Sequence, residues 1–177
     1  MVSDDRQGHI HYENPFVTPI HQRDPVRRLR GRLAAPVTIW TTGSGASRSG
    51  LTMSSILVAE GEPSSVLGLV SDTTTLFEVI GETGTFVVHV IDEENHILAD
   101  VFAGLRPAPG GMFEGLEVED SDWGPVLTQF GNRAYCKVWD TTPAGYQVLV
   151  RGAIEELELA ELTHPLTYFR GRYRSLR

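Results

Sequence analysis

The chain has 177 residues, a formal net charge of −8 and a hydrophobic fraction of 41%. This length favours one domain that folds without disulfides or metals. The negative charge argues against a nucleic-acid partner, and no stretch is apolar for long enough to cross a membrane. Without a signal-peptide pattern, and with Cys136 as the only cysteine, a cytoplasmic location is expected, with Cys136 as a buried, inert thiol.

The first 32 residues are expected to form an N-terminal arm ahead of one domain at residues 33–177. His9 and His11 lie in this arm, but no third ligand follows at a suitable spacing, so no metal site is predicted. Arginines form one basic run at 23–32 and another at 170–177. These runs either offset the acidic middle of the chain or reach an anionic ligand.

Regular structure is expected from about residue 35. The segment Pro36–Thr42 alternates its β-branched residues and predicts a strand, followed by a Gly/Ser turn at 43–49. Leu51–Ala59 is predicted to be the second strand of this hairpin, and Ser65–Ser71 a third strand.

The hydrophobic period then changes to that of a helix over Thr73–Glu82, where Ser71, Asp72 and Thr73 are competent N-caps. A strand is predicted for Thr85–Ile91, and a second short helix for Glu93–Phe102.

The last third of the chain is predicted to be mostly strand, over Leu116–Glu119, Arg133–Thr141 and Gln147–Leu159. A turn at 142–145 joins the two long strands, and a tail rich in Tyr and Arg follows. Six or more strands in hairpins with two short helices predict a mainly β fold, a β-barrel with short inserted helices.

Two hydroxyl-rich segments are the candidates for chemistry, because no common catalytic or phosphate-binding motif is present. In the first, Thr52 and Ser54 point to one face of a regular strand and Ser55 to the other. Hydroxyls on a face suited to burial either bond to neighbouring backbone groups or serve a ligand with many acceptors.

The second segment, Ser71–Thr75, lies at the start of the first predicted helix. A helix N-terminus offers free N–H groups and a partial positive charge, so added hydroxyls make a reasonable phosphate site. Taken alone, the segment is better explained by ordinary N-capping, which any helix of this kind can show.

In order and spacing, these segments resemble the flavin reductase-like family, which has the FMN-binding split-barrel fold. The resemblance covers about residues 33–176. Its motifs are a V-T-V-like strand at Val37–Ile39, a G-x-T-x-S-S segment at Gly50–Ser55, the strand TFVVHVI at Thr85–Ile91, FAG at Phe102–Gly104, and YFRGRY at Tyr168–Tyr173.

The resemblance implies an FMN-binding NAD(P)H:flavin oxidoreductase that is a homodimer and uses NADH or NADPH as co-substrate. FAD is the alternative flavin, and a flavin-dependent monooxygenase is a candidate recipient of the reduced flavin. No catalytic side chain is expected, because the cofactor carries out the hydride chemistry. The implied cofactor-binding residues are Thr41, Thr42, Thr52, Met53, Ser54 and Ser55 for the ring and ribityl chain, Ser71, Thr73 and Thr75 for the phosphate, and Arg172 and Tyr173, with Arg170, from the C-terminal segment.

One departure from the family keeps a second hypothesis open. Many members carry a histidine before the last hairpin, whereas this chain has Gly145 and Tyr146 there. A non-catalytic FMN- or heme-binding carrier or sensor on the same fold is therefore the alternative. The histidine that does lie in a predicted core strand, His89, is expected to be a buried histidine with satisfied hydrogen bonds.

Overall fold

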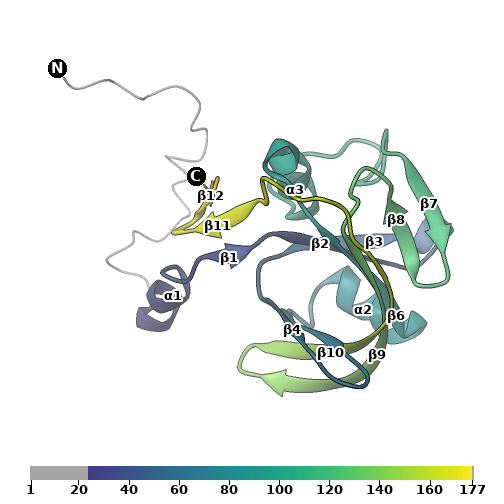
Figure 1. The fold of residues 1–177 in the computed structure, drawn as a ribbon, viewed down its shortest axis with the longest axis horizontal. Coiled ribbons are helices and arrows are strands. Elements are labelled where there is room, and N and C mark those ends of the chain that lie inside the picture. Colours follow the sequence, from purple (N-terminus) through teal and green to yellow (C-terminus); the bar gives the residue numbers. More distant parts are fainter. Residues whose placement is uncertain (1–23, 177) are drawn as a thin grey trace.

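The computed structural model describes residues 24–176, so the predicted arm residues up to Arg23, with His9 and His11, lie outside it. One antiparallel sheet dominates and curls on itself (Figure 1). Its strand order is β3-β2-β6-β9-β10-β5-β4, with bounds β2 (Thr38–Thr42), β3 (Ser49–Met53), β4 (Ile56–Ala59), β5 (Ser65–Val70), β6 (Thr85–Val90), β9 (Arg133–Ala144) and β10 (Gln147–Glu158). This architecture confirms the predicted mainly β, barrel-like fold.

Two strands that follow each other in the chain, β3 and β4, lie at opposite ends of the strand order. The prediction of one continuous strand over Leu51–Ala59 is therefore wrong. β3 pairs with β2, β4 pairs with β5, and Ser54–Ser55 span the change of partner. Periodicity cannot reveal such a break, because it depends on which distant strands supply the hydrogen bonds.

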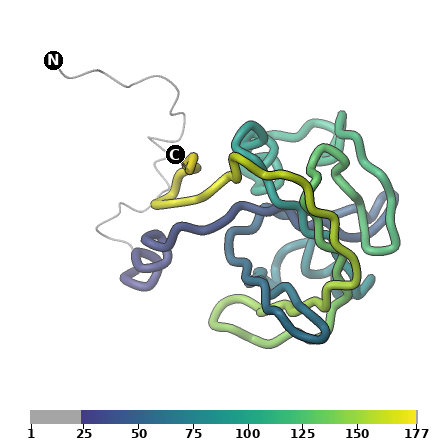
Figure 2. The backbone as a smooth tube through the Cα atoms, viewed as in Figure 1, coloured from purple at the N-terminus to yellow at the C-terminus, as the bar shows by residue number. Residues whose placement is uncertain are grey.

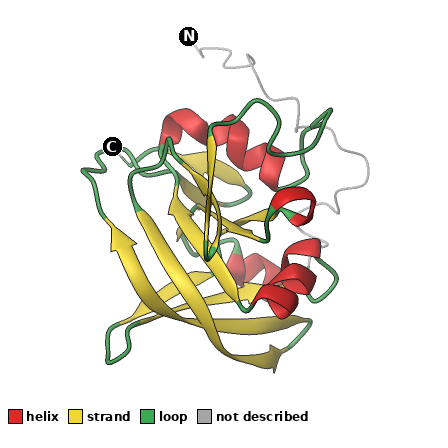
Figure 3. Ribbon diagram, turned by 90° about the vertical axis from the view of Figure 1, so that its right-hand side faces the viewer, coloured by secondary structure: helices red, strands yellow, loops and turns green. Residues whose placement is uncertain are grey.

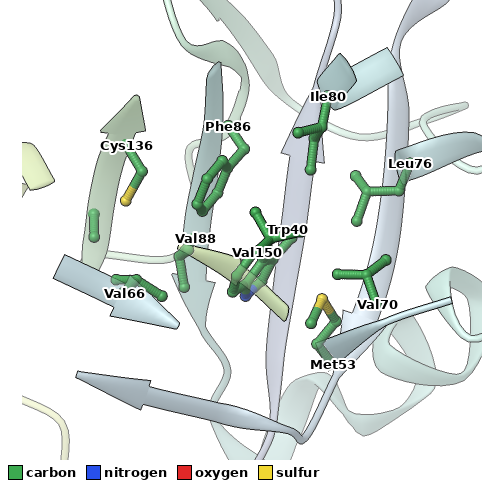
Figure 4. Packing of buried hydrophobic residues seen from close by; sticks show 11 residues of the cluster. Trp40, Met53, Val66, Val70, Leu76, Ile80, Phe86, Val88, Cys136 and Val150 are labelled. Carbon is green, nitrogen blue, oxygen red and sulfur yellow. The ribbon is translucent and has the colours of Figure 1, made fainter. Parts of the chain in front are cut away.

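The core inside the curled sheet is built around a stacked aromatic pair (Figure 4). The rings of Trp40 and Phe86 are parallel within 7°, with 4.5 Å between their centroids. Glycines on facing strands make room for them: a Cβ at Gly68 would lie 2.6 Å from the Trp40 ring, and one at Gly152 would lie 2.5 Å from Phe86. Small residues opposite large ones thus allow dense packing.

Helix α2 (Thr75–Thr83) covers this core with Leu76, Val79 and Ile80. It ends at Gly84, whose φ of 70° is the left-handed conformation that glycine adopts most readily. The predicted helix is confirmed, and it begins two residues later than predicted. The buried thiol of Cys136 lies in the same core, and burial, followed by the charge of Glu155, raises its pKa to about 12. Cys136 is thus the inert core thiol that was expected.

A second cluster lies beside the barrel, where the 3-10 turn η3 (Glu93–Asn95) leads into helix α3 (His96–Phe102). Figure 3 shows the helices gathered on one side of the sheet. A two-stranded sheet of β7 (Val118–Ser121) and β8 (Gly124–Leu127) follows. The short strand β8 was not predicted. A 3-10 turn, η2 (Gly45–Ser47), occupies the predicted Gly/Ser turn.

The described parts of the two basic runs, residues 24–32 and 170–176, lie side by side, away from the barrel (Figures 1 and 2). The amide of Arg170 donates to the carbonyl of Gly31 at 3.0 Å. Helix α1 (Pro25–Arg30) precedes a three-stranded sheet of β1 (Ala35–Pro36), β11 (Thr167–Phe169) and β12 (Arg172–Arg174). Helix α1 lies in the predicted arm and was not predicted. None of the helices within residues 24–176 is long and apolar enough to cross a membrane.

Candidate functional site

The sheet brings the two hydroxyl-rich segments next to each other at the split. The carbonyl of Ser55 accepts a hydrogen bond from the amide of Leu69 at 3.1 Å, which places Ser54 and Ser55 alongside the last residues of β5. Ser71 follows that strand directly. Adjacent strands are about 4.8 Å apart, so both segments border one small region.

Within residues 24–176, the hydroxyls of Ser54 and Ser55 make no hydrogen bond, although both residues are half-buried. Hydroxyls in such a position are available to a bound molecule as donors and as acceptors. Of the two explanations open for the first segment, this placement favours a ligand for Ser54 and Ser55.

The turn before α2 is held by its own hydroxyls. The Ser71 and Thr73 hydroxyls lie 2.9 Å apart, and the Thr74 hydroxyl donates to the carbonyl of Ser71 at 2.8 Å. The N-cap is Thr74, whose hydroxyl accepts from the amide of Phe77 at 3.3 Å. The helix starts at Thr75, later than predicted. The residues predicted as N-caps therefore precede the actual cap; they are Ser71, Asp72 and Thr73.

Because α2 starts later than predicted, Ser71, Thr73 and Thr75 lie around its N-terminus and none of them is the N-cap residue. Thr73 and Thr75 are exposed. The first amides of the helix have no partner inside the helix, and the helix dipole places partial positive charge there. The side chain of Asp72 is also exposed, so its carboxylate can be solvated instead of being buried next to an anion.

The first pair of predicted flavin residues, Thr41 and Thr42, is placed elsewhere. Thr42 pairs with Ser49 and Thr38 with Met53, so the end of β2 lies at the opposite end of the hairpin from Ser54. Both threonines are completely buried. Their hydroxyls donate to the carbonyls of Pro125 and Thr85, respectively. The structure does not bring these two residues to the other hydroxyls, and this placement does not support contact with a flavin.

The next pair, Thr52 and Met53, shapes the segment from inside. The Thr52 hydroxyl donates to the carbonyl of Ala99 in α3 at 2.6 Å. Met53 is 4% exposed and packs in the core with Trp40. The side chain of Met53 therefore supports the segment from inside. Only the backbone of Met53 is available to contact a ligand.

The C-terminal residues Arg172 and Tyr173 belong to β12, and Tyr173 packs against α3. The ring of Tyr173 meets that of His96 in α3 edge-on, with 6.5 Å between the ring centroids. Burial, followed by the charge of Asp100, raises the pKa of Tyr173 well above its usual range, so the phenol stays protonated. Arg172 is exposed, and Arg170 adopts a φ of 52° in the turn that joins β11 to β12.

The hairpin turn of β9 and β10 also borders the region. Val148 pairs with Val70 in this antiparallel pair, so Gln147 lies beside Ser71. Tyr146 lies at the tip of the turn. The side chain of Tyr146 is fully exposed. His89 lies elsewhere, with its Nδ1 3.1 Å from the carbonyl oxygen of Ile39. It is the buried, satisfied histidine that the sequence predicts.

Two residues of this region were not identified from the sequence. Asp100 is only 7% exposed, and its carboxylate pairs with Arg106 at 3.3 Å. The available signal was an acid within the apolar helical pattern of Leu98, Val101 and Phe102. Thr74, the true N-cap, was hidden by three neighbours that are equally good caps.

A curled antiparallel sheet that is split between two consecutive strands, β3 and β4, defines a split-barrel domain. The sequence model of the family described as "Flavin reductase like domain" matches residues 30–177. The chain therefore belongs to the flavin reductase family.

Among its relatives, the chain is similar to the NADH-dependent FMN reductase AsuE2 of Streptomyces nodosus subsp. asukaensis. The two are 32% identical over 158 residues, which cover 88% of this chain and 85% of that protein. It is also 29% identical to the reductase component of 4-hydroxyphenylacetate 3-monooxygenase of Thermus thermophilus, over 87% of this chain and 97% of that one.

Solved structures agree with this assignment. The fold superposes on nitrilotriacetate monooxygenase component B from Mycobacterium thermoresistibile with a TM-score of 0.77 and 26% identity, covering 86% of this chain and 85% of that one. It superposes on flavin reductase PheA2 with a TM-score of 0.78 and 24% identity, covering 88% of this chain and 99% of that one. The second likeness, at its lower identity, supports the fold alone.

Proposed function

We propose that the protein is an NADH-dependent flavin reductase that binds FMN at the split of the barrel. The observation that carries this proposal is the meeting of Ser54–Ser55 with Ser71–Thr73, next to the N-terminus of α2. It is supported by relatives that are named NADH-dependent FMN reductases.

The residues present fit FMN. The amides at the start of α2, with the hydroxyls of Ser71, Thr73 and Thr75, suit the phosphate. The unengaged hydroxyls of Ser54 and Ser55 suit the polar edge of the ring and the ribityl chain. Thr52 and Met53 support that segment, and Arg172 and Tyr173 are proposed to approach the flavin from β12.

When bound, the flavin supplies the hydride-accepting centre, so the protein needs neither a nucleophile nor a strong base. The described residues fit this assignment of the hydride chemistry to the flavin. Cys136 is buried and protonated, His89 has both ring nitrogens engaged, and neither lies at the split. The task of the chain is to bind, orient and leave one face of the ring accessible.

The reduced flavin would leave for a second protein. Two relatives are named as reductase components, one of 4-hydroxyphenylacetate 3-monooxygenase and one of FADH(2)-dependent resorcinol hydroxylase. We therefore infer a flavin-dependent monooxygenase as the partner. FAD is the alternative flavin, since the second of these names specifies it.

The active form is proposed to be a homodimer of the domain at 33–177, with residues 1–32 as its arm. No residue of α1 is buried, and Val26 and Leu29 are 72% and 60% exposed. On β4, an edge strand of the seven-stranded sheet, Leu57 is 71% exposed. Apolar residues on an unpaired edge strand and an uncovered helix favour contact with another chain. A cytoplasmic location is also proposed, because NADH is the co-substrate and Cys136 is a free thiol.

One observation favours a second candidate, a non-catalytic FMN- or heme-binding carrier or sensor. The turn beside Ser71 presents Gly145 and the fully exposed Tyr146, with no histidine for a nicotinamide. Such a protein would bind FMN without turnover.

The test measures NADH consumption by purified protein in air, with and without added FMN. Flavin-dependent consumption supports the reductase. Quenching of FMN fluorescence on binding, with no consumption of NADH or NADPH, would select the carrier. A protein that neither quenches FMN fluorescence nor consumes NADH would contradict both.

A further inference from the structure

Charge is distributed very unevenly between the barrel and the two ends of the chain. Residues 24–36 and 167–176, with α1, β1, β11 and β12, form a basic module that carries seven arginines and one acid. Residues 37–166 carry nineteen acids against four arginines and one lysine. The molecule is therefore a strongly acidic barrel from which a small basic module projects (Figure 1).

The basic module has no surface of its own chain to cover it. All seven of its arginines are exposed, and no residue of α1 is buried. Within residues 24–176, the four arginines at 27–32 form no ion pair. Arg28 and Arg32 line one surface pocket together with Leu29, so cations and an apolar side chain lie together there. A helix of six residues is too short to be stable in isolation, so a further contact is expected to hold it.

A surface of opposite charge lies at one end of the barrel. Ser65 pairs with Ala59 on one side and with Ala153 on the other, so the turn between β4 and β5 lies beside the last part of β10. Exposed carboxylates and exposed apolar side chains occur together at this acidic end: Glu60, Glu62, Glu155, Glu156, Leu57, Val58 and Leu157. None of its four carboxylates forms an ion pair with another residue of 24–176.

The other group of acids on the barrel fits the basic module less well. It lies on β7 and in the turn after it, where Asp120 already pairs with Arg48 at 2.8 Å. No large apolar side chain is exposed between residues 117 and 124. The acidic end at β4 and β10 offers both unpaired carboxylates and apolar side chains, which are also the two kinds of group that α1 presents.

We propose that the basic module of each subunit docks on the acidic end of a second copy of this chain, in a reciprocal contact with two-fold symmetry. Both surfaces are present on every copy, so a two-fold arrangement pairs each module with the other copy's acidic end and closes the assembly. Opposite charges orient the two copies, and the apolar side chains supply the buried area. This inference rests on the proposed homodimer and adds the two surfaces that form it.

The first test is the salt dependence of the dimer. Analytical ultracentrifugation of the full-length protein at about 50 mM and about 500 mM NaCl measures its dissociation constant. Salt screens exposed charges over a distance of about 10 Å at 0.1 M and over less at higher concentration, so the dimer should weaken by roughly tenfold. A dimer whose dissociation constant stays the same across this range would overturn the inference.

The second test reverses the charge of each surface separately. One variant carries Arg28→Glu with Arg32→Glu, and the other carries Glu60→Lys with Glu62→Lys. Each should weaken its own dimer by at least about tenfold, because like charges then meet in both halves of the contact. In an equal mixture the two variants should form a heterodimer, since every reversed surface meets an oppositely charged one. Native mass spectrometry detects it, and a mixture without heterodimers would overturn the inference.

A matched control separates the named surfaces from net charge. Glu119→Lys with Asp122→Lys makes the same change of charge as the Glu60 and Glu62 variant, but at β7, on the far side of the barrel from the module (Figure 1). All of these side chains are exposed, and circular dichroism verifies that each variant is folded. The control should dimerise like the wild type, and an equal weakening of its dimer would overturn the inference.

The outcomes also separate this inference from the proposed function. A wild-type dimer that responds neither to salt nor to charge reversal overturns this inference alone. Wild-type protein that is monomeric in all conditions overturns the proposed homodimer with it. In either case, consumption of NADH in the presence of FMN still decides separately whether the protein is a flavin reductase.

Discussion

The Nε2 atom of His89 accepts a hydrogen bond from the backbone amide of Leu127 at 3.0 Å, in a position without solvent exposure. Its other ring nitrogen lies 3.1 Å from the carbonyl oxygen of Ile39, so the ring is neutral and carries its proton on Nδ1. This single side chain joins β6 to both β8 and β2, and it cannot take up a second proton without losing the bond to Leu127.

The first prediction follows from that neutral ring. Burial, partly opposed by the bond to Ile39, lowers the pKa of His89 to about 3. In the unfolded chain the pKa is about 6.5, so between these values only the unfolded state takes up the proton. The free energy of unfolding is therefore unaffected by His89 above about pH 6.5 and falls as the pH drops toward 3.

From this residue alone, the loss between about pH 7 and about pH 5 is roughly 2 kcal/mol. Urea unfolding at the two pH values measures it. His89→Gln should be less stable at neutral pH but should lose less stability on acidification than the wild type. Equal losses in the two proteins would show that His89 is not the group responsible.

Two glycine substitutions should change stability in opposite directions. Gly68→Ala places a Cβ 2.6 Å from the Trp40 ring, which is fixed by stacking on Phe86, and should cost about 1–3 kcal/mol through overpacking. Gly81→Ala lies on the exposed face of α2, where a Cβ meets nothing within 4 Å, and should gain about 0.5–1 kcal/mol. Thermal or urea unfolding checks both, and a neutral Gly68→Ala would contradict the packing described for the core.

The phosphate end of the proposed site has its own test. Ser71→Ala removes a hydroxyl from the turn before α2 and should weaken FMN binding roughly tenfold, the value of a hydrogen bond to a charged group. Riboflavin lacks the phosphate, so its affinity should be the same for Ser71→Ala and the wild type. A variant that loses affinity for both flavins equally would place Ser71 elsewhere along the ligand.

A substitution at Thr42 tests whether this residue has a structural role or a ligand-binding role. Thr42→Val removes a buried hydroxyl that bonds to the Thr85 carbonyl at 2.7 Å, and should cost about 1–3 kcal/mol of unfolding free energy. FMN affinity should stay within about twofold of the wild type, since the position lies at the far end of the hairpin from Ser54. A large loss of FMN affinity at unchanged stability would instead support the family-based expectation of flavin contact.

Most strands of the seven-stranded sheet, the helices α2 and α3 and the class of fold could be predicted from hydrophobic period and turn residues, because these signals are local. The split at Ser54–Ser55 could not, because it depends on β3 and β4 choosing partners far apart in the chain. The residue pattern alone could not separate capping from ligand binding at Ser71–Thr75. The structure identifies Thr74 as the capping residue, because α2 starts at Thr75, and ligand binding by Ser71, Thr73 and Thr75 stays a prediction.

The site residues divide in the same way. The segments that carry Ser54, Ser55 and Ser71 lie next to each other, because Ser54–Ser55 lead into β4 and Ser71 follows β5, the neighbouring strand. Thr41 and Thr42 look equally suitable in sequence, but every residue of β2 is buried, and their hydroxyls bond to the carbonyls of Pro125 and Thr85. The packing of Tyr173 against α3 required knowing that the C-terminal strand returns to this helix, since Tyr173 and His96 are more than 70 residues apart in the chain.

The central claim is that this chain binds FMN and reduces it with NADH, and anaerobic mixing tests it most directly. The protein is first loaded with FMN, and NADH or NADPH is then added while the visible absorbance of oxidised flavin is followed. Bleaching by NADH, faster than for free FMN, is the predicted result. Protein-bound FMN that keeps its oxidised absorbance with both nicotinamides would contradict the claim.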